Sequence, residues 1–268
     1  MKRPWLLAVA LLAAGSVLAD TYVLGVTPQF ERRQLFAIWT PILNELSRRT
    51  GHTFQLATAP NIREFEHQYN GGAYDLAYMN PYLAIANPQG YLPILRDANP
   101  IRGILVVRKD SPIQSVSDLE GKEIAFPAPN AIAASLLIRA ELTRRFKVKF
   151  ASRYVQSHTA VYLNVAQGLA AAGGGVQKTL DEQKDALKDQ LRVVYVTSAV
   201  PSLPIAVHPR VPARAREAIR AAFLDFAATP EGAALLKEVP IGQLAVTSRK
   251  DYEPLRELGL QEFFVAEP

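Results

Sequence analysis

The chain has 268 residues, 49% of them hydrophobic, and a formal net charge of +5 at pH 7. It contains no cysteine, which excludes disulfides, thiolate zinc sites, iron–sulfur clusters and cysteine nucleophiles. The length suffices for one large domain or two smaller ones with their own cores, and the scattered basic residues argue against nucleic acid as a partner.

The first residues predict an exported protein. Lys2 and Arg3 precede an almost wholly apolar run from Trp5 to Ala14, and small residues suited to cleavage end at Ala19. This order is typical of a secretory signal peptide, because the apolar run is too short to span a bilayer comfortably. We expect residues 1–19 to be cleaved near Ala19, which places the mature protein in the periplasm of a Gram-negative host. An uncleaved anchor helix is the alternative.

Downstream of this leader, apolar strand patterns alternate with helical ones, which implies a parallel α/β layer. The predicted strands cover residues 21–26, 52–57 and 74–79. The helix after the first strand has an apolar face formed by Leu35, Ile38, Trp39, Ile42 and Leu46. Because Pro41 lies inside this pattern, we expect a kink or a restart with Thr40 as the cap. A short second helix begins at Asn61 and ends at Gly71-Gly72.

The middle of the chain repeats the alternation after a crossover. The apolar run 104–107 predicts a strand that leaves the first layer, and 122–126 predicts another strand. Asn130 is a favourable N-cap for a helix over 131–146. A further helix follows Ser157-His158, with apolar positions at Val161, Val165 and Leu169. The block closes with a polar helix near Leu180–Leu187 and a strand at Leu191–Val196.

A second crossover is expected over residues 201–212. After it, 213–227 is amphipathic, and Thr229 followed by Pro230 marks the start of another helix. The tail from Val246 onward is predicted to form a last helix and loop. This order fits an α/β protein of two lobes, the second inserted into the first, with a hinge and a cleft between them.

The stretch from Ser157 to Val176 contains the most informative polar residues. Ser157 and His158 stand at a predicted helix start, where backbone N–H groups lack a partner within the helix and bind anions. Their side chains add further hydrogen-bonding groups. The run Gly173-Gly174-Gly175 lacks the lysine and hydroxyl residue of a phosphate-binding P-loop. We therefore interpret it as a tight entry into a strand.

Several stretches, taken in order, carry a resemblance that covers nearly all of the mature chain. They are Trp39-Thr40-Pro41, Tyr74-Asp75-Leu76-Ala77-Tyr78, Gly121-Lys122-Glu123-Ile124-Ala125-Phe126, Ser157-His158 with Val165 and Gly168, and Pro204-Ile205. In this order and spacing, the chain resembles periplasmic solute-binding proteins of the phosphate, phosphite and phosphonate ABC-transporter family. The resemblance implies a type II binding fold with an interlobe cleft.

The resemblance also implies where the lobe boundaries lie and which partners the protein binds. Lobe 1 is expected to comprise residues 20–104 and 205–268, and lobe 2 residues 105–204. A small anionic ligand and an ABC permease of the inner membrane are the expected partners. We expect a monomer that needs no cofactor and no metal.

Two departures from the family pattern bear on the ligand. Relatives place hydroxyl residues at the helix start after the 122–126 strand, whereas this chain has Asn130, Ala131 and Ile132. The backbone N–H groups there are still available to an oxyanion. Ala171 stands where relatives often carry an acidic residue. Both departures favour a small oxyanion, such as phosphate, phosphite or a simple phosphonate, over an aminoalkylphosphonate.

The candidate ligand-binding residues are each weighed against a structural role. His158 and Ser157 are predicted to contact the ligand, although a lone histidine is more often structural. Tyr78 and Asn80 follow a buried strand at the edge where α/β clefts form, but Tyr78 also suits the core. Phe30 lies after the first strand and either walls the cleft or staples a helix. Asn130, Ala131 and Ile132 complete the set through their N–H groups.

An enzyme is not expected. The histidines are dispersed, and the sequence contains neither an H-E-x-x-H nor a G-x-S-x-G motif. The predicted function is therefore capture of a small oxyanion by hinge closure for an ABC transporter. The alternatives are a periplasmic sensor that reports its ligand to a membrane sensor kinase, and a protein for an apolar or heterocyclic ligand, which the alanine-rich 131–134 turn would suit.

Overall fold

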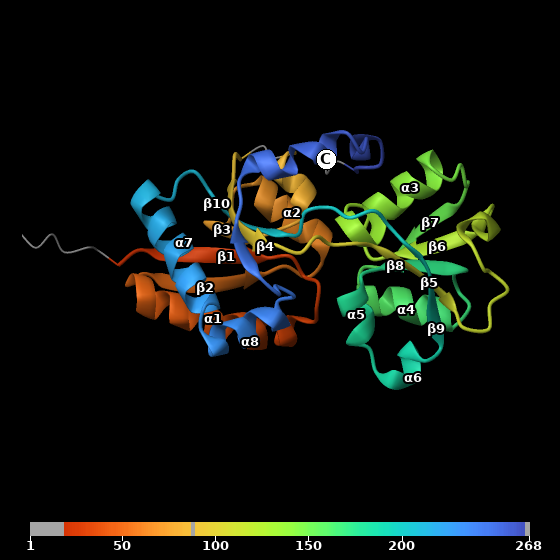
Figure 1. The fold of residues 1–268 in the computed structure, drawn as a ribbon, viewed down its shortest axis with the longest axis horizontal. Helices are drawn as coiled ribbons and strands as arrows, with labels where there is room; N and C mark the ends of the chain where they lie inside the picture. The colour runs from red at the N-terminus through yellow and green to blue at the C-terminus, as the bar shows by residue number, and fades with distance from the viewer. Residues whose placement is uncertain (1–18, 87–88, 266–268) are drawn as a thin grey trace, which may run out of the picture.

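Two mixed sheets form two lobes that lie side by side (Figure 1). The structure is a computed structural model and describes residues 19–86 and 89–265. The first sheet has the strand order β11-β4-β10-β3-β1-β2 and the second the order β7-β6-β8-β5-β9. The α/β architecture with two lobes is the one that the sequence predicts. Residues 1–18 of the predicted signal peptide lie outside the described residues.

The first sheet and its helices draw on both ends of the chain. Its strands are β1 (Thr21–Val26), β2 (Thr53–Thr58), β3 (Leu76–Tyr78), β4 (Leu92–Asp97), β10 (Pro204–Val207) and β11 (Leu244–Val246). Its helices and 3-10 turns are α1 (Arg32–Thr50), α2 (Ile62–Asn70), η1 (Pro81–Ala84), α7 (Ala213–Ala227), α8 (Pro230–Glu238), η4 (Arg249–Arg256) and η5 (Leu260–Glu262).

The second sheet is built from the middle of the chain. Its strands are β5 (Ile104–Arg108), β6 (Glu123–Phe126), β7 (Ala151–Tyr154), β8 (Ala172–Gly175) and β9 (Leu191–Val196). Its helical elements are η2 (Val116–Leu119), the π-helix η3 (Ile132–Leu137), α3 (Ile138–Arg144), α4 (His158–Ala166), α5 (Gln177–Asp181) and α6 (Asp185–Lys188).

The chain passes between the lobes at 98–103 and 197–203. These two segments meet in an antiparallel bridge, in which the N–H groups of Ile101 and Val200 each donate to the other residue's carbonyl at 2.9 and 3.0 Å. Directly after each passage the chain enters its new sheet as an antiparallel strand. β5 pairs with β8 and β9, and β10 pairs with β3 and β4. The passages lie a few residues before the predicted crossovers, because residues 104–108 and 204–207 are already strands of the sheet that the chain enters.

Where local signals were strong, the predicted elements are confirmed. Helix α7 occupies the predicted residues and buries the predicted face of Ala215, Ile219, Phe223 and Phe226. Thr229 caps α8 by accepting a hydrogen bond from the N–H of Gly232, and Pro230 takes the first helical position. Asn61 caps α2 in the same way through the N–H of Glu64.

Other expectations were wrong. Helix α1 runs unbroken past Pro41, without a restart at Thr40. The polar helix near Leu180–Leu187 is two short helices, α5 and α6. The tail is 3-10 turns, preceded by strand β11, which the sequence did not indicate. Asn130 does not cap an α-helix over 131–146, because Ala131 is the cap of π-helix η3 and α3 ends at Arg144.

The first sheet has an apolar cluster on each face, and one of them extends into the second lobe. One face packs against α1, α7 and α8. The cluster on the other face joins Phe65 of α2 and Leu83 of η1 to Leu136 of the second lobe and to Tyr252 near the C-terminus. The lobes are therefore fused through apolar packing along this face. Within the described part of the chain, no helix is both long and apolar enough to cross a membrane.

Candidate functional site

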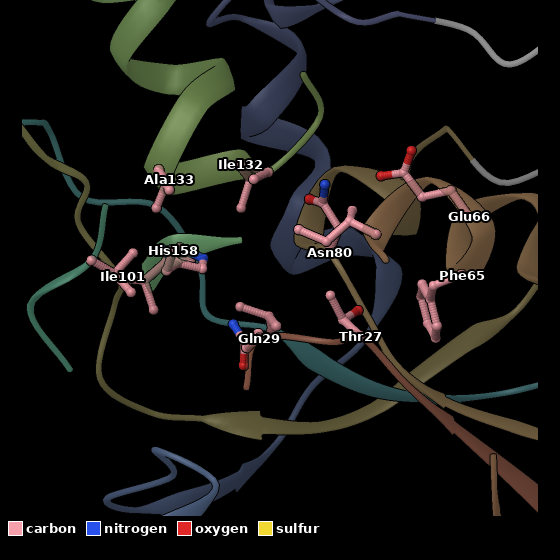
Figure 2. Close-up of a pocket in the computed structure, with 14 residues that line it drawn as sticks. Thr27, Gln29, Phe65, Glu66, Asn80, Ile101, Ile132, Ala133 and His158 are labelled. Carbon is pink, nitrogen blue, oxygen red and sulfur yellow. The ribbon is translucent and has the colours of Figure 1, made fainter. Parts of the chain in front are cut away.

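A cavity of about 50 Å³ lies between the lobes, next to the point where the chain crosses. In Figure 2 the start of η3, with Ile132 and Ala133, lies above the cavity, and Thr27 and Gln29 lie below it. His158 and Asn80 face each other across it. The lining residues are Thr27, Gln29, Ile62, Phe65, Glu66, Asn80, Ile101, Ala131, Ile132, Ala133, Ala134, His158, Val176 and Leu203.

An outer chamber of about 540 Å³ adjoins this inner cavity. The two share Gln29 and His158 in their walls. Its remaining walls come from the start of α1 and the 58–60 loop on one lobe and from α4 and α5 on the other. The Gln34 side chain of α1 donates to the carboxylate of Glu182, the C-cap of α5, at 2.9 Å across this chamber. The chamber thus adjoins the inner cavity at Gln29 and His158.

The start of η3 supplies backbone donors to the inner cavity. The N–H groups of Ser135 and Leu136 both donate to the Ala131 carbonyl, at 2.8 and 3.0 Å. The N–H groups of the preceding residues, Ile132 to Ala134, belong to the first turn, where a helix offers them no internal acceptor. Ile132, Ala133 and Ala134 line the cavity together with Ala131. Because their side chains are apolar, only their backbone can bind a polar ligand.

Glycines allow this helix start to lie close to the second sheet. A Cβ atom on Gly103 would collide with the Ala133 carbonyl, and one on Gly174 would collide with the Ala134 carbonyl. Gly173 and Gly175 similarly leave room for Val161 and Tyr162 of α4. The predicted strand entry at 173–175 is thus strand β8 itself. Its lack of side chains lets η3 and α4 approach from both faces.

His158 is the first residue of α4, and Ser157 caps that helix by accepting a hydrogen bond from the N–H of Ala160 at 3.1 Å. The His158 ring is only 6% exposed although it contributes to the walls of both spaces. Burial lowers the pKa of His158 to about 4, because desolvation disfavours the charged ring. The imidazole is therefore neutral near pH 7 and has one donor and one acceptor nitrogen.

The far side of the His158 ring meets a network of hydroxyl groups at Nδ1. Nδ1 of His158 lies 3.3 Å from the Thr179 hydroxyl, which donates to the Val176 carbonyl at 2.9 Å. The Tyr162 hydroxyl lies 2.7 Å from the same Thr179 oxygen. The Tyr162 hydroxyl also donates to the Val176 carbonyl at 3.2 Å. One arrangement of these protons has Nδ1–H of His158 donating to the Thr179 hydroxyl. In that arrangement Nε2 is an acceptor.

Asn80 completes the polar lining opposite His158. It follows β3, and its Oδ1 accepts from the N–H of Tyr82 at 3.0 Å. Its Nδ2 donates to the Asn130 carbonyl of the other lobe. An amide nitrogen has two N–H bonds, so this group can serve the contact between lobes and a ligand together.

The structure brings together most of the predicted ligand residues. Asn80, Ala131, Ile132 and His158 line the inner cavity, and Phe30 and Ser157 line the outer chamber. Tyr78 instead lies in the core of the first lobe, 4% exposed, and packs against the Trp39 ring. Its hydroxyl donates to the Val239 carbonyl at 3.3 Å.

Two further expectations are changed by the structure. Asn130 was expected to offer its N–H to a ligand, but it is not among the residues that line the cavity, and its side chain bonds to Glu66 and Val265. Ala171 packs in the apolar cluster of the second lobe. The residue after β8 that lines the cavity is Val176. The alanine at 171 therefore carries no information about the ligand.

Sequence reasoning missed several cavity residues. Thr27 and Gln29 follow β1 at the same sheet edge that pointed to Phe30, so that rule could have found them. Glu66 is an acidic residue on the buried face of α2, 3% exposed, and a buried carboxylate is itself a signal. Ile101 and Leu203 come from the two passages between the lobes, and their place follows from the tertiary structure alone.

Comparison with known proteins relates this geometry to one group. A family model described as "ABC transporter, phosphonate, periplasmic substrate-binding protein" matches residues 24–252. The Phosphonates-binding periplasmic protein of Escherichia coli (strain K12) is 22% identical over an alignment of 253 residues, which covers 88% of this chain and 75% of that protein.

Solved structures show the same fold. A binding protein component of an ABC phosphonate transporter from Pseudomonas aeruginosa superposes with a TM-score of 0.78 at 17% identity, covering 91% of this chain and 88% of that one. PhnD1 from Prochlorococcus marinus (MIT 9301), solved in complex with methylphosphonate, gives a TM-score of 0.79 at 13% identity, covering 90% and 98%. These likenesses show the two-lobed type II fold that the sequence predicts.

Proposed function

The chain belongs to the family of periplasmic substrate-binding proteins of phosphonate ABC transporters, and on this basis we propose that it captures a small oxyanion of the phosphonate, phosphite or phosphate class. Its partner would be the permease of that transporter. We propose further that the leader is cleaved near Ala19, that the lobes divide at 104–105 and 204–205, and that the protein acts as a monomeric binder without catalysis.

The observation that carries the proposal is the convergence of neutral hydrogen-bonding groups on one small cavity. The helix-start N–H groups of 132–134, the Asn80 amide and the His158 ring reach it from different elements. Backbone N–H groups at a helix start combine donor geometry with the positive end of the helix dipole. This set binds the oxygens of a tetrahedral anion without the hydroxyl cluster that relatives carry.

The charge of the lining favours an oxyanion that still carries a proton. Among the described residues, neither a lysine nor an arginine lines the inner cavity, so no side-chain cation balances a second negative charge. We propose the tautomer in which Nδ1–H of His158 donates to Thr179, which leaves Nε2 as an acceptor. Such a nitrogen binds a P–OH group and repels a bare oxyanion. We therefore propose the singly charged form of the ligand as the bound species.

The size and polarity of the cavity limit the rest of the ligand. The volume is about 50 Å³, and much of the wall is apolar, with Ile62, Ile101, Ile132, Val176 and Leu203. A hydrogen or methyl substituent on phosphorus fits such a wall, whereas a charged substituent would lose its solvation there. The methylphosphonate bound by the Prochlorococcus relative supports a ligand of this size.

Capture would proceed through the outer chamber. Ligand enters between α1 and α5, meets the donors of the second lobe, and stabilises the closed form through its contacts to Asn80 and Thr27 of the first lobe. The bond between Gln34 and Glu182 would form as this side closes.

Calorimetric titration of the purified protein tests the proposal. We expect methylphosphonate, phosphite and phosphate to bind, at least one of them with a Kd in the micromolar range or below. Sulfate is the matched control, because it is tetrahedral and has no proton near neutral pH. Binding of none of the phosphorus oxyanions would reject the proposed ligand class, and equal affinity for sulfate would reject the protonated form.

A further inference from the structure

Asn130 stands at a junction between both lobes and the C-terminus. It is 1% exposed. Its Nδ2 donates to the Glu66 carboxylate of α2 and to the Val265 carbonyl, both at 2.8 Å, and its Oδ1 accepts from the N–H of Val265 at 2.9 Å. Its own carbonyl accepts from Nδ2 of Asn80. Both the donors and the acceptor of this one amide are thus satisfied by groups outside the second lobe.

The C-terminal strap, residues 258–265, continues this junction along α3. Nη2 of Arg139 donates to the Phe263 carbonyl at 2.7 Å and to the Pro129 carbonyl at 2.6 Å. Arg144 at the end of α3 forms an ion pair with Glu262 at 2.7 Å. Figure 1 shows this part of the chain, in dark blue, reaching from the first lobe toward α3. The strap is a connection between the lobes in addition to the two passages of the chain.

The junction lies immediately before the cavity donors. Asn130 precedes Ala131, whose carbonyl accepts from both Ser135 and Leu136 and so shapes the wide first turn of η3. The next residues are those whose N–H groups face no acceptor within the helix. The position of these donors relative to Asn80 and Thr27 is therefore set by what holds residue 130.

Resting on the proposed function, we infer that Asn130 is a positioning residue for the oxyanion site, and that it acts by tying the start of η3 to α2 and to the C-terminal strap. Its side chain does not touch the ligand. It fixes the N–H groups of 132–134 in place before the ligand arrives, so that less ordering is needed on binding. Preorganisation of this kind raises affinity without adding a contact.

Three variants of the full-length protein separate positioning from mere stability. Asn130→Ala removes the junction. Asn130→Asp keeps its size and its acceptor for Val265 but loses the donor and sets a second carboxylate beside Glu66. Leu236→Ala is the control, because Leu236 is buried in the first-lobe core on α8, away from the strap. Methylphosphonate titration, melting temperature and amide hydrogen exchange are measured for each variant and the wild type.

The expected result is a loss of affinity of about ten-fold or more in Asn130→Ala, equal or greater in Asn130→Asp. Leu236→Ala should lower the melting temperature while its Kd stays within about two-fold of wild type. In the ligand-free protein, exchange of the Ser135 and Leu136 amides should rise in both Asn130 variants and not in the control.

The outcomes distinguish this inference from the proposed function. Unchanged exchange at Ser135 and Leu136 in Asn130→Ala overturns the inference whether or not the wild type binds methylphosphonate. Wild-type affinity in either Asn130 variant overturns it as well, as does a loss in Leu236→Ala as large as that in Asn130→Ala. A wild-type protein that binds no phosphorus oxyanion rejects the proposed function, while the exchange result still decides whether Asn130 holds the helix start.

Discussion

The two lobes are held together differently on the side of the C-terminal strap, called the strap face, and on the side of the outer chamber, called the chamber face. On the strap face, Asn130 and Arg139 bond to the C-terminal segment, and an apolar cluster runs from the first lobe into η3 and α3. On the chamber face, a space of about 540 Å³ separates the lobes, and Gln34 bonds to Glu182 across it. Because the strap face is the more firmly held side, we expect opening and closing of the lobes to pivot about it.

The proposed ligand site therefore has one half on the strap face, at the start of η3, and another half at His158, beside the chamber. The N–H groups of η3 lie on the fused face, where packing holds them. His158 lies where the inner cavity meets the chamber. Under the proposed function, a ligand that enters through the chamber would pass His158 and come to rest against the N–H groups of η3.

The largest effect is expected from breaking the fused face. Leu136 is fully buried in the cluster shared by both lobes. Leu136→Ala should lower the free energy of unfolding by about 2–5 kcal/mol, because it leaves a cavity in a packed core. Urea unfolding measures it. Leu163→Ala, at a site on α4 that is 40% exposed, should change stability by less than about 0.5 kcal/mol; similar losses in both variants would contradict the comparison.

The buried ring of His158 should make stability depend on pH. Its pKa is lowered to about 4 in the folded protein, against about 6.5 in the unfolded chain. As the pH falls, His158 therefore takes up a proton in the unfolded state before it does in the folded state. The contribution of the neutral ring to folding stability is complete above about pH 6.5 and is lost toward pH 4. The difference corresponds to roughly 3 kcal/mol.

Urea unfolding of wild type and His158→Gln between pH 4 and 7.5 isolates this contribution, because the other titrating groups are common to both proteins. The wild type should lose more stability on acidification than the variant does. Parallel pH profiles would show that the ring is solvated, and the chamber face would then be wetter than its geometry indicates.

Removing the His158 ring should also weaken the binding of methylphosphonate, because the ring lies beside the chamber at the proposed site. His158→Ala should reduce the affinity for methylphosphonate by about 1.5–3 kcal/mol, if the ring bonds to a charged ligand. Calorimetry measures this, and circular dichroism checks that the fold is intact. Thr159→Ala, which alters the outer chamber alone, is the matched control and should bind like wild type. An unchanged Kd in His158→Ala would assign the histidine a structural role.

The smallest effect is expected from the hydrogen bond that crosses the outer chamber. The hydrogen bond between Gln34 and Glu182 is exposed, and such bonds contribute little because water replaces them. Gln34→Ala should change the unfolding free energy by less than about 0.5 kcal/mol and the Kd by less than about two-fold. A loss above about 1 kcal/mol in urea unfolding would mean that the chamber face also holds the lobes together.

Much of the fold could be predicted because its signals are local. The face of α7 and the Thr229-Pro230 start of α8 lie within a few residues of one another in the sequence. The edge rule for α/β clefts also selected Asn80, and the helix-start rule selected His158, both of which line the inner cavity. These rules depend on strand and helix ends, which short patterns locate.

The strap face could not be predicted, because its partners are distant in sequence. Asn130 looked like an N-cap by composition, but it bonds to Val265, 135 residues away. That tertiary contact competes with the local capping role and prevails. Tyr78 followed the edge rule and nevertheless turned into the core, where Trp39 packs against it. A strand end fixes the backbone position, and packing decides which way the side chain points.

The most direct test of the central claim is a titration of ¹⁵N-labelled protein with methylphosphonate, followed through the amide resonances of Ile132, Ala133 and Ala134. These N–H groups should become donors to a charged oxygen, so their proton signals should shift downfield and saturate with the calorimetric Kd. The same amides should stay unmoved in sulfate. Shifts confined to outer-chamber residues such as Thr159, with the helix-start amides unchanged at saturation, would contradict the account.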